Sequence, residues 1–185
     1  MPLGAARFGL SGADLGKLEL IETKTVSGVS SAIFTSIQES TYNVHFMTIQ
    51  KYQPTTDDQS FRIRFFESGV EESASVYQRA QYISDTAPSN ADFRSTADDK
   101  IVAIWNTGSA TNEIGNAYLY FYNLGDSSKY SFVTQQEVHW TKTPRLRQSF
   151  GSAVLPQTST VDQIKLFVPT GNFSCTASLY GIKEI

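Results

Sequence analysis

Apolar and polar residues alternate along most of this chain, beginning at residue 18. In residues 60–66, for example, Phe61, Ile63 and Phe65 alternate with two arginines. Successive side chains of a β-strand point to opposite faces, so this pattern predicts a half-buried strand. The same kind of pattern predicts further strands over residues 18–23, 31–37, 42–49, 75–83, 100–105, 117–122, 130–140, 147–155, 163–168 and 173–182.

Clusters of turn-forming residues separate these predicted strands. They are rich in Pro, Gly, Asn and Asp, and they lie at residues 53–58, 87–90, 123–126 and 168–172. No segment has a convincing helical period; residues 69–79 come nearest, but they are rich in serine. About ten or eleven short strands spaced by turns are typical of an antiparallel sandwich or barrel. We therefore expect residues 18–185 to form an all-β, antiparallel β-sandwich or jelly-roll-like domain.

Residues 1–17 differ from the rest because closely spaced glycines separate large apolar residues. Glycine at this density weakens any helix or strand. One interpretation is a floppy terminus, and the other is an extended arm that becomes ordered on its own subunit or on a neighbour. We expect a docking arm, with its candidate interface residues at Leu3, Arg7, Phe8, Leu10 and Leu15.

Composition excludes several classes of protein. A chain of 185 residues fits one domain with a short appendage, and a net charge of −3 argues against a general nucleic-acid binder. No apolar run approaches the roughly 20 residues that span a bilayer, and Arg7 interrupts the only segment resembling a leader. Cys175 is the single cysteine, so no intrachain disulfide can form, and its apolar neighbours predict a buried strand position.

Residues capable of chemistry are few. His45 and His139 are far apart in sequence and, with one thiol, fall short of the usual ligands of a zinc site, so we expect structural roles on strand faces. The acid pairs at 57–58 and 98–99 lack the spacing of a calcium loop and predict polar turns. Adjacent acids at 71–72 do not face each other across a substrate, as glycoside cleavage requires. We expect no catalytic residue, no metal and no cofactor.

The densest aromatic run lies at residues 118–122. On a strand, Tyr118, Tyr120 and Tyr122 line one face, while a leucine and a phenylalanine line the other. If the leucine face is core, the tyrosines point outward or toward a second sheet, where they can stack on sugars or anchor a protein interface. The alternative is a strand buried on both faces. These tyrosines are the candidate ligand or partner face.

Two blocks of the sequence look familiar. The first is Tyr-containing residues 42–49, the polar turn 53–58, the arginine-bearing segment 61–65, the Ser-Gly loop 67–70 and residues 75–77; the second is 161–166, 171–174 and the Leu-Tyr-Gly-Ile-Lys segment 179–183. Over residues 20–185 this arrangement resembles small virion structural proteins of tailed bacteriophages, marine ones in particular.

The resemblance implies a β-sandwich or jelly roll on the particle surface, assembled in the bacterial host cytoplasm. It implies a non-enzymatic capsid decoration or head appendage that contacts other virion proteins, either major capsid or tail proteins. A homo-oligomer is expected, with a trimer favoured, and neither nucleic acid nor membrane as a partner. The alternative is a tail-fibre or receptor module that binds a host glycan through the tyrosine face with Trp105 and Trp140.

Overall fold

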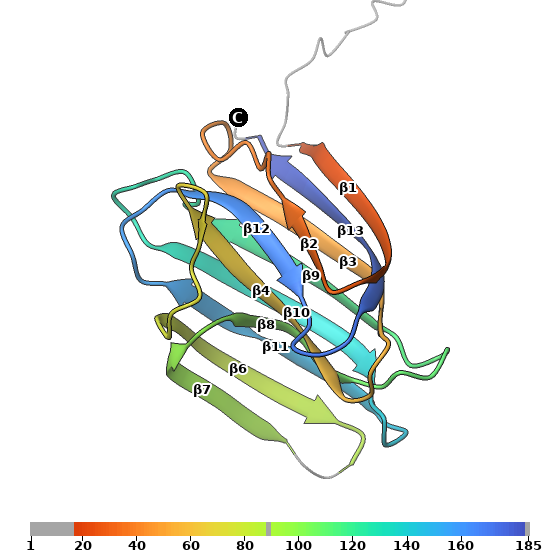
Figure 1. Cartoon of the computed structure of the whole chain (residues 1–185). Helices are drawn as coiled ribbons and strands as arrows, with labels where there is room; N and C mark the ends of the chain where they lie inside the picture. Colours follow the sequence, from red (N-terminus) through yellow and green to blue (C-terminus); the bar gives the residue numbers. More distant parts are fainter. Residues whose placement is uncertain (1–16, 88–89, 184–185) are drawn as a thin grey trace, which may run out of the picture.

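The computed structural model describes residues 17–87 and 90–183, and over these residues two antiparallel β-sheets pack as a sandwich (Figure 1). All of the regular elements described are strands, which confirms the expected all-β antiparallel sandwich. The larger sheet contains, in order across the sheet, β1 (Leu18–Val29), β13 (Phe173–Ile182), β3 (Val44–Pro54), β9 (Gly115–Tyr122), β10 (Ser131–Trp140), β11 (Leu146–Leu155), β6 (Tyr77–Asp85) and β7 (Ala91–Asp98). The smaller sheet contains β2 (Ser31–Phe34), β12 (Val161–Phe167), β4 (Gln59–Glu67) and β5 (Val70–Glu71), with β8 (Ile101–Thr107) also paired to β4.

Alternation of side chains decides which face of each strand is core. In β4, Phe61, Ile63 and Phe65 are fully buried between the sheets, and the intervening arginines stay partly exposed. The two-residue loop that joins β4 to β5 consists of Ser68 and Gly69, which have φ values of 52° and 76°. Positive φ at both positions is the requirement of a type I′ hairpin turn, for which Gly is well suited. The local sequence therefore specifies both the strand and its end.

The sequence predicts no strand at β7 or at the two-residue β5, and the structure corrects this. Asp92, Phe93 and Arg94 show why β7 escapes detection: at the edge of the sheet, only one of these positions is apolar. An edge strand needs little apolar sequence because it is paired on one side and exposed on the other. The predicted strand at 42–49 also continues to Pro54, because a bulge interrupts its alternation without ending its pairing.

Aromatic side chains fill one end of the core between the sheets. The Tyr52 and Phe61 rings stack with centroids 4.4 Å apart, and the Phe173 ring meets Phe61 edge-on at 4.8 Å. The Tyr52 hydroxyl donates to the Gln59 carbonyl at 3.1 Å, so this buried polar atom has its partner. These contacts join β3 and β13 of the larger sheet to β4 of the smaller one.

Strand β8 joins the two sheets along one side. One of its edges pairs with β4, and its Val102 carbonyl accepts hydrogen bonds from the side-chain amides of Gln81 and Gln135, at 2.9 and 2.6 Å. Those two glutamines lie on β6 and β10 of the larger sheet. At the end of β8, Thr107 forms a backbone bridge with Thr141. Side-chain amides therefore supply part of the connection that a continuous backbone ladder would make.

The described chain enters β1 and leaves β13 at the same corner. The backbone nitrogen of Lys183 donates to the carbonyl of Lys17 at 3.2 Å. The predicted arm precedes this corner, and its candidate interface residues Leu3, Arg7, Phe8, Leu10 and Leu15 lie outside the described residues.

Candidate functional site

The candidate site is the face of the larger sheet that points away from the smaller sheet, called the outer face below. Strand pairing aligns its side chains in rows that run across the sheet. The first row, from β1 to β6, is Leu18, Ile182, Val44, Tyr122, Phe132, Val154 and Gln78. The second is Leu20, Tyr180, Phe46, Tyr120, Thr134, Ser152 and Ala80. The third is Thr23, Ser178, Thr48, Tyr118, Gln136, Phe150 and Tyr82.

An aromatic cluster occupies the middle of the outer face. The Phe46 ring lies 4.8 Å from the Tyr120 ring, 6.3 Å from Tyr118 and 6.1 Å from Tyr180, measured between centroids. The Tyr120 ring also stacks with Tyr122 at 6.5 Å. These rings come from three neighbouring strands, β13, β3 and β9, and they support one another at distances typical of favourable aromatic pairs. The cluster is therefore a continuous surface assembled by strand pairing.

The three tyrosines predicted as a ligand or partner face do share the outer face. Between them, Leu119 and Phe121 are fully buried in the core, whereas Tyr118 remains 43% exposed and Tyr120 and Tyr122 are half-buried. The alternative of a strand buried on both faces is therefore wrong.

No residue in the three rows is charged. Their polar members are hydroxyls and amides, some of which pair within the face: the Tyr118 hydroxyl donates to Oε1 of Gln136 at 2.5 Å, and the Tyr122 and Thr134 hydroxyls lie 3.3 Å apart. The large hydrophobic side chains left most open on this sheet are Leu18, Leu20, Tyr118, Phe132, Val138, Trp140, Leu146 and Phe150. Aromatic enrichment with depletion of charge is the composition of the buried centre of a protein interface.

Two depressions make the outer face uneven. A groove of about 540 Å³ lies over β10, β11, β6 and β7, and its lining includes Phe132, Val154, Ser152, Gln78 and Arg94. A second depression of about 330 Å³ lies over β3, β9, β10 and β11, and its lining includes Phe46, Tyr118, Gln136, Val138 and Gln148. Both combine rings with uncharged hydrogen-bonding groups, and the first also has arginines on the β6–β7 side, so they can accept either protruding side chains or sugar rings.

The two tryptophans lie in different places. Trp140 follows the same alternation as Val138 on β10 and is 37% exposed. Trp105 lies on β8, where its ring is 4.4 Å from that of Phe93 and beneath the guanidinium of Arg79 at 4.9 Å. The prediction that Trp105 joins the tyrosines on one face is therefore wrong, because β8 is a strand of the other sheet.

His139 and Glu137 form a hydrogen-bonded pair on the inner face of β10. Nδ1 of His139 lies 2.7 Å from Oε2 of Glu137, and both side chains are fully inaccessible to solvent. Strand pairing places Ser149 opposite Glu137, and its hydroxyl, like Oε1 of Glu137 and Nε2 of His139, has no hydrogen-bond partner. A histidine oriented by a carboxylate is the arrangement of a general base. Because the pair is closed off from solvent, a substrate cannot reach it.

His45 is also buried on its strand. Its Nε2 lies 2.8 Å from the carbonyl oxygen of Ile37, and burial lowers the pKa of the imidazole. The expectation that both histidines have structural positions on strand faces is therefore confirmed.

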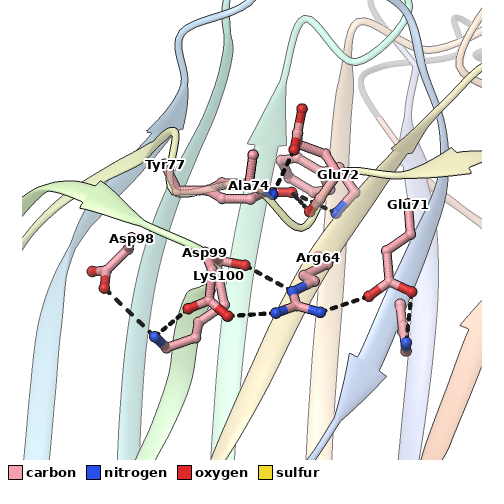
Figure 2. Close-up of polar contacts among 10 residues, drawn as sticks. Arg64, Glu71, Glu72, Ala74, Tyr77, Asp98, Asp99 and Lys100 are labelled. Atoms are coloured by element: carbon pink, nitrogen blue, oxygen red, sulfur yellow. Dashed lines mark hydrogen bonds and ion pairs between the residues drawn. The ribbon is translucent and has the colours of Figure 1, made fainter.

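The acidic residues at 98–99 and 71 form an ion-pair network beside the smaller sheet, which Figure 2 shows. Arg64 donates from Nη1 to Glu71 at 3.0 Å and from Nε to the Asp99 carbonyl at 2.7 Å, and it also pairs with the Asp99 carboxylate. Lys165 bonds the other oxygen of Glu71 at 2.7 Å. Asp98 ends β7 and Asp99 lies in the turn before β8, as predicted for a polar turn, and strand pairing also brings the distant cations Arg79 and Arg64 to them.

This network changes the titration of Glu71. Burial alone would raise the pKa of its carboxyl, but the hydrogen bonds from Lys165 and Arg64 outweigh burial, so the pKa lies below its usual value. The acids at 57–58 do behave as predicted for a polar turn. Asp57 accepts from the backbone nitrogen of Ser109 at 3.1 Å, which ties two loops together.

Cys175 is buried in β13, as predicted, and burial raises the pKa of its thiol to about 12. Over residues 17–87 and 90–183, no group of three or more His, Cys, Asp or Glu side chains is placed to hold a metal ion. In the same part of the chain, no helix has the length and apolar character to cross a membrane.

Sequence reasoning missed most partners of the three tyrosines. Phe46, Tyr180, Phe132 and Phe150 each occupy the outward position of a predicted strand, so the alternation assigns their face. The alternation does not give the register of strand pairing, and it is this register that brings residues far apart in the chain side by side.

Comparisons with protein-family models, with curated proteins and with solved structures found no match for this chain.

Proposed function

We propose that this chain is a non-enzymatic structural protein that assembles with other protein chains through its outer face. In line with the sequence resemblance, the assembly is the virion of a tailed bacteriophage, with the chain as a capsid decoration or head appendage. The observation that carries the proposal is the composition of the outer face: an aromatic cluster surrounded by hydroxyl and amide groups, with no charge in the rows from β1 to β6.

The physical argument concerns what an exposed surface normally contains. Charged residues make up 18% of this chain, yet the three rows of the outer face from β1 to β6 carry none. Exposed aromatic side chains lose unfavourable contact with water when a partner covers them, and they lose little conformational entropy in doing so. The enclosed Glu137–His139 pair also supports a structural role, since the arrangement closest to a catalytic one cannot meet a substrate.

Mass spectrometry of purified particles tests the virion role. Tailed particles would be isolated on a density gradient from the source that carries the gene. Their tryptic peptides would be compared with those of the gradient fractions that contain no particles. Peptides covering residues 65–79 and 130–142, each bounded by a basic residue, should be enriched with the particles. Peptides found only outside the particle fraction would contradict the proposal.

A glycan-binding module is the second candidate, favoured by the groove of about 540 Å³ beside Phe132. Rings for stacking and uncharged hydrogen-bonding groups such as Gln78 and Ser152 suit a sugar chain. A glycan array would be run with the intact chain and with Phe132→Ala and Tyr120→Ala. Retention of a glycan by the parent and its loss by either variant would support this function; no retained glycan would exclude it.

A further inference from the structure

We propose that the partner of the outer face is a second copy of this chain. The two outer faces would pack against each other about a two-fold axis that lies between the two copies. This inference rests on the proposed assembly role of the same face and adds the identity of its partner; it replaces the trimer that the sequence resemblance favours with a two-fold pair. The argument combines three features of the outer face: its hydrogen-bonding groups, its charge and its area.

The polar groups of the outer face suit pairing with themselves. A two-fold axis pairs residue i of one copy with residue j of the other and j with i, and residues beside the axis meet their own copies, so the face as a whole must be compatible with itself. Hydroxyls, such as those of Tyr118, Tyr122 and Thr134, and amides, such as that of Gln136, each donate and accept hydrogen bonds. Copies of these side chains can therefore bond to one another without placing donor against donor.

The absence of charge from the three rows points in the same direction. Near a two-fold axis, a charged side chain faces the same charge on its partner, which is unfavourable once water is removed. The three rows avoid this conflict from β1 to β6, and a charged pair continues them on β7, where Asp92 and Arg94 are bonded to each other. A different protein as partner could have used charges for recognition, and the rows offer none.

The area of the face is that of a stable interface. Neighbouring strands lie about 4.8 Å apart and residues on one face of a strand about 6.7 Å apart, so the three rows from β1 to β11 cover about 30 Å by 20 Å. That is on the order of 600 Å² per partner, which is at the lower end of the roughly 600–1,000 Å² per partner of a standard interface. Phe132 and Phe150, which are 45% and 54% exposed, protrude near the groove over the same strands and can fill the partner's depressions.

Analytical ultracentrifugation of the full chain tests the pairing. The parent should sediment with twice the 20.5 kDa mass of the chain. Tyr118→Lys and Phe132→Lys, which place a charge in two different rows, should each raise the dimer dissociation constant at least about 30-fold. The matched control is Val70→Lys, which charges the most exposed large hydrophobic side chain of the smaller sheet at β5 and should leave the dimer intact.

Several results would overturn the pairing. They are a parent that stays monomeric up to millimolar concentration, an oligomer that both outer-face variants leave unchanged, and an oligomer that Val70→Lys dissociates equally. Far-UV circular dichroism confirms that each variant is folded; if either lysine variant unfolds, Thr134→Arg in the second row replaces it with the same expected dissociation. A monomer whose peptides still purify with particles would reject self-pairing and retain the virion role, whereas a dimer missing from particles would do the reverse.

Discussion

Removing one member of the buried Glu137–His139 pair should destabilise the protein far more than removing one member of an exposed pair with the same spacing along a strand. Both side chains are fully buried, and they are joined by one hydrogen bond of 2.7 Å. Glu137→Leu keeps most of the volume but leaves His139 without that partner. Leaving one partner of a buried hydrogen bond unsatisfied costs about 1–3 kcal/mol, and more for a charged group, which is a large share of the roughly 5–15 kcal/mol that stabilises a domain.

β7 supplies a matched control. Asp92 and Arg94 are also two residues apart on one strand and bonded at 2.5 Å, but their side chains are 53% and 76% exposed. Water solvates whichever partner is left behind, so Asp92→Leu should cost at most about 1 kcal/mol. The two pairs share the spacing of two residues on one strand and differ in burial and in the base, which is histidine in one and arginine in the other.

Equilibrium urea denaturation followed by far-UV circular dichroism measures these free energies. Parent, Glu137→Leu, His139→Leu, the double variant and Asp92→Leu would be compared. The double variant should be more stable than the sum of the single losses predicts, by about 1–3 kcal/mol, because it leaves neither group unpaired. Strict additivity, or a loss from Glu137→Leu no larger than that from Asp92→Leu, would refute the reasoning.

Three further results are expected. The folded-state pKa of Glu71 lies below its usual value, so its carboxylate contributes fully to the free energy of unfolding above about pH 5, and this contribution is lost as the pH falls through the folded-state pKa. Glu71→Gln should therefore make the urea midpoint decline less steeply between about pH 5 and pH 3. An unchanged slope would contradict this prediction. Cys175, with its buried thiol, should not react with a disulfide reagent at pH 8 until urea unfolds the chain, so rapid reaction of the native protein would argue against its burial. Gly151→Ala would place a methyl carbon 2.3 Å from the Ala80 carbonyl oxygen, and the resulting strain should lower the free energy of unfolding by about 1–3 kcal/mol; a variant as stable as the parent in thermal denaturation would show that β11 shifts freely.

Alternation predicted the fold class and the inward face of most strands because it depends on neighbouring residues alone. Phe61, Ile63 and Phe65 are the clearest case, since all three are fully buried as expected. Alternation could not predict β7, where packing at an edge needs few apolar residues. Alternation also could not predict that Asp99 meets Arg64, because this contact depends on how β8 pairs with β4.

The candidate site was predicted only in part. Residues 118–122 revealed a tyrosine face because all three rings belong to one strand. The surface they belong to also needs Phe46 and Tyr180, which arrive from strands placed beside β9 by long-range pairing. Their adjacency follows from register, which the sequence leaves open unless one face and its turns together determine it.

The way β8 is held has a mechanical consequence. Its Val102 carbonyl is bonded by the side-chain amides of Gln81 and Gln135, which are only 5% and 6% exposed, so close-packed side chains fix the spacing between the two layers there. Bending the larger sheet away from β8 would break these buried hydrogen bonds, at a cost of about 1–3 kcal/mol for each group left unpaired. The outer face over β6 and β10 is therefore stiffened from behind, and a contacting molecule must fit the curvature that it meets.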